Sequence, residues 1–151
     1  MPASRTVRDP ELLAIANFSG ITATTLLNFV GINGSVDPSV DLGNIDISSI
    51  ILESEVTAIS GTTPTLRVSV LTSNKQAIDA TSANALQGDG STQFQTPANQ
   101  TAVGTVQVGL APQAASGATS NNIGKYLGLR ATVGGTTPVI SGQVRLYVKG
   151  K

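Results

Sequence analysis

Acidic residues supply the first candidates for chemistry in this chain, because it contains neither histidine nor cysteine. Glu53 and Glu55 are two residues apart, so on an extended strand their side chains share one face, roughly 6–7 Å apart. Two carboxylates at such a distance resemble the pair that a glycosidase uses. Glycosidase carboxylates usually come from different elements across a cleft, so we interpret this pair as part of a solvated or interfacial strand face.

A second acidic group lies in a loop rich in Pro, Gly and Asn, where Asp37, Asp41 and Asp46 follow one another. These three carboxylates could gather around Ca²⁺, an ion that prefers oxygen ligands. Their spacing is not that of an EF-hand, and no bidentate Glu follows at the required place. Asp is also common in turns, where its side chain hydrogen-bonds the nearby backbone, and we favour this interpretation. We therefore expect no cofactor and assign no metal ligand.

Other binding motifs are weaker. The Gly-Gly-Thr-Thr sequence at 134–137 resembles a phosphate-binding loop only loosely, since no Lys is adjacent and a strand rather than a helix follows. Nucleic-acid binding favours a basic excess and aromatic platforms, whereas the formal net charge is +0 and aromatics make up 3% of the chain. No apolar run approaches the ~18 residues of a membrane span. We expect a non-enzymatic protein with neither nucleic acid nor membrane as a partner.

Two stretches of alternating hydrophobicity must position these residues. In the first, from 50 to 72, one apolar face alternates with Glu53 and Glu55, and Ser-Gly-Thr-Thr-Pro at 60–64 breaks the strand. The second, from 126 to 149, uses Gly-Thr-Thr-Pro again at 135–138. We predict two equivalent β-hairpins. The apolar face of the first strand is Ile50, Leu52, Val56 and Ala58; the return strands should bury Leu66, Val68, Val70, Val144, Leu146 and Val148 together.

The rest of the chain predicts further short strands and no long helix. Residues 11–16 could form a helical turn or β structure, and short strands are expected near 21–25 and 26–30. A short strand centred on Phe94 and a better one at 101–110 follow. Residues 1–10 should form an extended N-terminal arm. The sequence thus predicts a single all-β domain over 1–151, an antiparallel β-sandwich or jelly roll of about eight strands.

Six residues are candidates for contacts with a partner, because Arg and Tyr are enriched at interface hot spots. Charged residues make up only 12% of the chain, and sheet edges poorly defended by Lys are normally covered. We therefore expect a homo-oligomer, either a dimer or a trimer. Those candidates that lie in the second hairpin could equally be cross-strand neighbours on a solvated sheet face. The six are Arg5 and Arg8 of the arm, and Tyr126, Arg130, Arg145 and Tyr147.

Two motifs give the chain a resemblance to a known class of proteins: Ser-Gly-Thr-Thr-Pro-Thr-Leu-Arg-Val-Ser-Val at 60–70 and Gly-Gln-Val-Arg-Leu-Tyr-Val-Lys-Gly-Lys at 142–151. A small, neutral, β-rich chain with these motifs resembles the accessory virion proteins of tailed bacteriophages, most nearly head decoration or cement proteins. The resemblance implies a chain made in the host cytoplasm that oligomerises on the capsid exterior. It also implies binding to the major capsid protein, bridging of neighbouring coat subunits, and no catalytic residues.

Two alternatives stay open beside this expectation. A tail-tube or other head–tail component is a related structural role. A carbohydrate-binding or receptor-binding β-sandwich is a different class, and such a module usually presents exposed aromatic platforms. With three Phe, two Tyr and no Trp in the chain, we favour the structural role.

Overall fold

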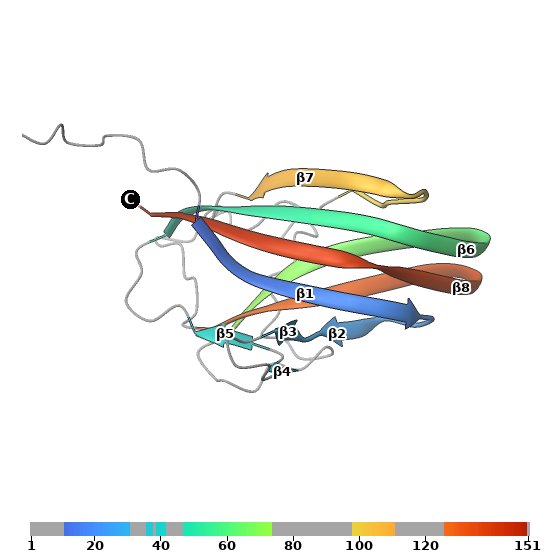
Figure 1. Ribbon diagram of the computed structural model, residues 1–151, viewed down its shortest axis with the longest axis horizontal. Coiled ribbons are helices and arrows are strands. Elements are labelled where there is room, and N and C mark those ends of the chain that lie inside the picture. The colour runs from blue at the N-terminus through green and yellow to red at the C-terminus, as the bar shows by residue number, and fades with distance from the viewer. Residues whose placement is uncertain are drawn as a thin grey trace, which may run out of the picture.

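The computed structural model describes residues 11–30, 36–37, 39–41, 47–73, 98–110 and 126–150, and every regular element within these ranges is a β-strand (Figure 1). The strands pair antiparallel in the order β4-β3-β1-β8-β6-β7, and β2 and β5 also pair with β8 outside this path. The predicted all-β class and antiparallel pairing are thus confirmed for the described residues. The elements are β1 (Glu11–Ile21), β2 (Thr25–Leu27), β3 (Phe29–Val30), β4 (Val36–Asp37), β5 (Ser39–Asp41), β6 (Ile47–Ser73), β7 (Gly104–Leu110) and β8 (Tyr126–Gly150).

The two longest strands, β6 and β8, form a ribbon around which the other strands are arranged. They pair with each other antiparallel over almost their whole lengths. Halfway along, Thr62 lies opposite Thr136, so the two Gly-Thr-Thr-Pro sequences are side by side. Figure 1 shows β6 and β8 both turning back at the right-hand end of the molecule. We call this bend, residues 61–64 and 135–138, the corner.

The corner uses backbone conformations that most residues avoid. Gly61 and Gly135 have φ values of 116° and 103°, and Thr63 and Thr137 both have 48°. Glycine adopts positive φ readily, whereas a β-branched residue there is uncommon. Each glycine also faces the backbone of the other strand. A Cβ on Gly61 would lie 2.7 Å from the carbonyl oxygen of Thr137, and one on Gly135 would lie 2.6 Å from that of Thr63. The two segments therefore nest against each other.

The prediction of two hairpins is wrong in its pairing, although the chain reverses where the turns were predicted. The half of β6 before the corner pairs with the half of β8 after it, and the remaining halves pair likewise. Alternation of apolar and polar residues determines which face each side chain takes, but it does not identify the neighbouring strand. The two Gly-Thr-Thr-Pro sequences lie side by side at the middle of the ribbon, not at the ends of two separate hairpins.

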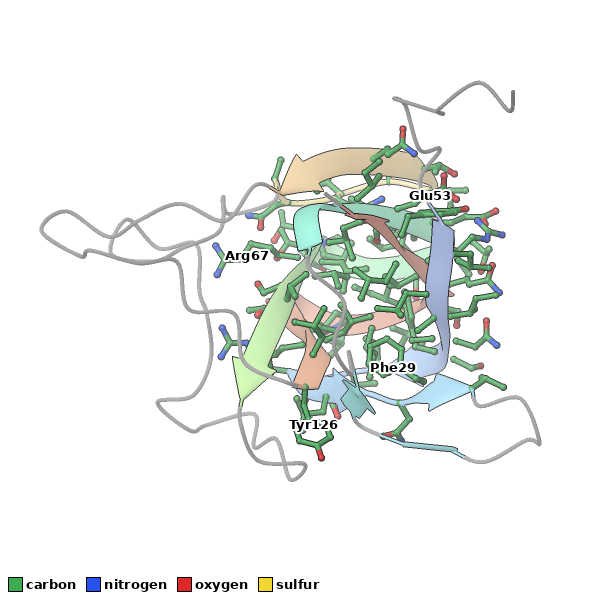
Figure 2. The ribbon with its side chains drawn as sticks, turned by 90° about the vertical axis from the view of Figure 1, so that its left-hand side faces the viewer. Phe29, Glu53, Arg67 and Tyr126 are labelled. Carbon is green, nitrogen blue, oxygen red and sulfur yellow. The ribbon has the colours of Figure 1, made fainter. Side chains whose placement is uncertain are left out.

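The core lies between the two halves of the bent ribbon. Phe18 of β1 and Phe29 of β3 join this cluster, and Figure 2 shows Phe29 among the interior side chains. Full burial of a large apolar side chain contributes about 1.5–3 kcal/mol, so the buried residues of this core account for much of the stability. The side chain of Val148 lies outside the described set. The predicted buried set is confirmed for its described members, Leu66, Val68, Val70, Val144 and Leu146.

The N-terminal part differs most from the prediction. Residues 11–21 form one strand, β1, where short strands near 21–25 and an undecided turn at 11–16 were expected. Long pairing with β8, from Glu11 opposite Val148 to Ile21 opposite Ile140, supplies the hydrogen bonds that local propensity did not indicate. The expected strand near 26–30 is confirmed in part by β2 and β3, and the one at 101–110 by β7. The arm at 1–10 and Phe94 lie outside the described residues.

Candidate functional site

The outward-pointing residues of β1, β8, β6 and β7 form one continuous surface, which we call the outer face. It lies on the opposite side of these strands from the core, because its residues alternate with the buried ones. Backbone register places its residues in rows that cross all four strands. The three rows are Leu12, Tyr147, Ile51 and Gly109; Ile15, Arg145, Glu53 and Gln107; and Asn17, Gln143, Glu55 and Thr105.

An ion network occupies the middle of the outer face. Nη1 of Arg145 donates to Oε1 of Glu53 at 2.7 Å and to Oε2 of Glu55 at 3.3 Å. Arg145 lies directly opposite Glu53 in the strand register. Arg145 is thus a cross-strand neighbour of Glu53, and this contact leaves open whether the same face also meets a partner. The two carboxylates singled out as a possible glycosidase pair both contact one guanidinium, which supports their interpretation as part of a polar strand face.

The carboxylates also affect the protonation of the arginine. The hydrogen bond to Glu53 raises the pKa of Arg145 above its ordinary value, and the negative charges of Glu53 and Glu55 act in the same direction, against a smaller opposing effect of desolvation. Because the pKa of this base is raised in the folded state, its pairing stabilises the fold at every pH at which the unfolded arginine is protonated. This contribution is lost only as pH rises through the folded-state pKa. The guanidinium therefore stays charged throughout the neutral range.

We expect Arg145→Gln to change stability only slightly, and less at high salt, because the side chains of the network are 21–37% exposed and exposed ion pairs are screened. Urea unfolding at low and at high salt measures this. Glu53→Gln is the matched control, since it removes the stronger contact from the other side. A large loss of stability at high salt would contradict an exposed network.

An apolar row borders the ion network. Tyr147 and Ile51 are half-buried on neighbouring strands, and Leu12 is 49% exposed. Tyr147 thus lies near Arg145 on the outer face, as the second stretch of the sequence indicated. An exposed sheet surface that combines Arg, Tyr and aliphatic side chains can contact a second protein surface.

The structure does not bring all four candidates of β8 together. Tyr126 and Arg130 belong to the half of β8 that precedes the corner, where Arg130 pairs with Ser69 and Leu26. Figure 2 shows Tyr126 far from Glu53, which marks the outer face. Both Tyr126 and Arg130 already interact within the chain. The outer face therefore contains Arg145 and Tyr147 but neither of the other two.

Several candidates from the sequence lie beyond the described side chains. Arg5, Arg8 and Asp46 fall outside the described residues, and Asp37 and Asp41 are described only as backbone of β4 and β5. Among the side chains that the structure describes, no group of three or more acidic residues could hold a metal ion. No helix within the same part of the chain has the length and apolar character needed to cross a membrane.

A buried polar contact that the sequence did not reveal joins β6 to the segment preceding β7. Oγ of Ser54 donates to Oε1 of Gln100 at 2.5 Å, and Nε2 of Gln100 donates to the carbonyl oxygen of Ser54 at 3.2 Å. The backbone of Gln100 exchanges two hydrogen bonds with Leu66, which lies beyond the corner. Gln100 therefore links both halves of β6. The one available signal was Ser54 itself, a hydroxyl in an apolar face that needs a buried partner.

The space beside this contact is too small for a substrate. A cavity of about 10 Å³ lies between β6 and β7, roughly enough for one water molecule. Apolar side chains make up most of its wall, with Ser54 and Gln100 as the polar members. We interpret the Ser54–Gln100 contact as a structural joint that holds the bent ribbon together.

Gln100→Leu should lower the free energy of unfolding by ~1–3 kcal/mol, because Ser54 then keeps a buried hydroxyl without its acceptor. Adding Ser54→Ala should recover part of this loss, since removing both partners leaves no unsatisfied group. Urea unfolding of the single and double variants measures both effects. Gln143→Leu is the control, because Gln143 donates to Asn17 at 2.7 Å in an exposed contact. Equal losses for the two Gln variants would contradict a buried joint.

No protein-family model matches this chain, and no curated protein matches it either.

Proposed function

We propose that this chain is a non-enzymatic structural protein of a virus particle, a decoration or cement protein on the outside of a bacteriophage head. In this role it binds the major capsid protein and bridges neighbouring coat subunits. The outer face is the observation that carries the proposal. It offers a continuous protein-binding surface, and its charged residues already pair with one another instead of surrounding a substrate cavity.

The mechanism is adhesion by repetition. One copy need bury only a modest area across the seam between two coat subunits, because many copies act together on a symmetric shell. Arg145 and Tyr147 suit the centre of such a contact, since both residue types are enriched at interface hot spots. The neutral formal charge imposes little repulsion between copies packed side by side.

We further propose that the complete chain is a β-sandwich or jelly roll and works as a homo-oligomer, a dimer or a trimer. The bent ribbon supports the first part, because it places the two halves of β6 and of β8 on either side of one core. A low charge, and the lack of Lys in β4 and β7, which end the strand order of the described residues, support the second part.

Cryo-electron microscopy of phage particles purified from cells that produce this chain tests the proposal. Extra density on the outside of the shell, at seams between coat subunits, is the expected result. Density in the tail would instead support a tail-tube or head–tail role. Absence of the chain from the particles would contradict any structural role in the virion.

Deletion of residues 1–10 should leave folding intact and weaken decoration. The arm has too little apolar surface to offset the ~1–2 kcal/mol of backbone entropy that each ordered residue costs, so alone it should stay mobile. Arg5 and Arg8 could pair with acidic groups of a neighbouring subunit. Circular dichroism reports folding, and occupancy on particles at increasing salt reports binding. Undiminished occupancy would show that the arm is only a tail, and loss of folding would place it in the core.

A further inference from the structure

The strand β7 presents an edge that no other described strand covers. It pairs with β6 on one side, from Val56 opposite Gly104 to Ile50 opposite Leu110. Within the described ranges, β7 ends the strand order. Thr105, Val106, Gln107 and Gly109 are exposed. Such an edge leaves a row of backbone N–H and C=O groups available to another strand.

Nothing in the composition of β7 protects this edge. Proteins usually defend an exposed edge with Lys, Pro or an inward-pointing charge. The chain has no charged residue anywhere from 90 to 124, and β7 contains neither Pro nor a register shift against β6. An undefended strand of this length is normally covered by a partner.

The residues of β7 suit a second copy of the same strand. A two-fold axis through Gln107 would place Gln107 opposite itself, Val106 opposite Val108 and Thr105 opposite Gly109. Val106 is 39% exposed in one copy, and in the pair Val108 of the second copy would cover it. β-Branched pairs across strands stabilise a sheet. Because the strand carries no charge, its two-fold pairing brings no like charges together.

We propose that β7 pairs antiparallel with β7 of a second copy, centred on Gln107, so that the sheet continues across a symmetric dimer. The inference deepens the proposed function, on which it rests for the expectation that copies of this chain associate. Pairing through one short strand buries less than the ~1,000 Å² of a stable interface, so the dimer should be weak in solution. On a shell, its contacts would add to those with the coat.

A single engineered cysteine tests the geometry, because the natural chain contains none. Residues directly opposite across an antiparallel pair have Cβ atoms about 4.5–5.5 Å apart, close to the separation that a disulfide needs. Under mild oxidation at high concentration, Gln107→Cys should form a covalent dimer. Gln143→Cys, the same change two strands away on β8, should stay monomeric. Equal crosslinking of both variants, or none at Gln107, would overturn the proposal.

A charge exchange tests the contact without a covalent bond. Gln107→Lys and Gln107→Glu should each weaken self-association at least ~10-fold, because each places like charges opposite one another. A mixture of the two variants should regain association as a heterodimer. Sedimentation and light scattering coupled to size exclusion measure this. Because Gln107 is exposed, both variants should fold, which circular dichroism checks. Unchanged association of either variant alone would overturn the contact.

These outcomes separate the dimer from the proposed function. If the natural chain stays monomeric at every concentration but decorates particles fully, the dimer is wrong and the decoration role stands. If Gln107→Cys crosslinks and the mixed charges rescue association, but imaging finds no chain on particles, the dimer stands and the decoration role is wrong.

Discussion

Val144→Asp should lower the free energy of unfolding by about 4 kcal/mol or more at neutral pH, a large part of the ~5–15 kcal/mol typical of a folded domain. Val144 is 0% exposed on the inner face of β8, next to Leu146 and across from Ser54. A carboxylate at this position would lose its hydration. Among the described residues, the neighbouring cation is Arg145, which lies on the opposite face of the strand and cannot pair with it.

The loss should depend on pH. Burial raises the pKa of the introduced carboxyl above that of the unfolded chain, so the folded state of the variant binds its proton more tightly. Its stability is then highest below the unfolded pKa of about 3.9 and falls as pH rises from there to the folded pKa. Urea unfolding at several pH values measures this.

Val139→Asp is the matched control for this substitution. It makes the same change on the same strand, but Val139 is 43% exposed. We expect it to change the free energy of unfolding by less than ~1 kcal/mol. Equal losses in the two variants would contradict the burial of Val144, and a larger loss for Val139→Asp would mean that the inward and outward residues of β8 are exchanged, as after a one-residue slip in register.

Gly61→Ala and Gly135→Ala should each cost about 3 kcal/mol or more, because two effects combine at the corner. The first is backbone strain, since φ values of 116° and 103° are almost confined to glycine. The second is steric, since each new Cβ would lie under 3 Å from a carbonyl oxygen of the other strand. Backbone atoms cannot move aside as a flexible side chain can.

Two controls separate these effects by thermal or urea unfolding. Gly20 has φ of 60° with no atom within 4 Å of a built Cβ, so Gly20→Ala reports strain alone. Gly109 has neither a positive φ nor a close neighbour, so Gly109→Ala should be nearly neutral. We expect the two corner variants to lose more than Gly20→Ala. Corner losses no larger than that of Gly109→Ala would show that the two turns do not nest.

Local sequence patterns predicted the faces of the strands better than their partners. Period-two alternation identified Leu66, Val68 and Val144 as buried, because one face of a strand must meet the core. It failed at Ala58, expected inside but exposed, because the register shifts between Val56 and Ala58 and turns the side chain outward. Such an irregularity depends on the neighbouring strand and leaves no mark in local alternation.

The same contrast between strand faces, which the sequence predicts, and strand partners, which it does not, holds at the candidate site. Placing Arg145 and Glu53 on outward strand faces required only alternation, but their direct contact depends on the pairing of β6 with β8. Gln100 was missed because it lies in a short irregular segment. Its importance comes from Ser54 and Leu66, which are distant in sequence and adjacent only in the fold.

The pairing of β6 with β8 also constrains how the chain folds over time. No half of the ribbon can complete its backbone hydrogen bonds until its partner has been synthesised. The strand β1 also depends on β8, since the amide of Gly20 donates to Oγ of Ser141, 121 residues away. Such a high contact order belongs to chains that fold in milliseconds to seconds. The growing chain must therefore carry the apolar face of β6 unpaired until translation reaches β8, and its sparse charge gives that intermediate little protection from aggregation.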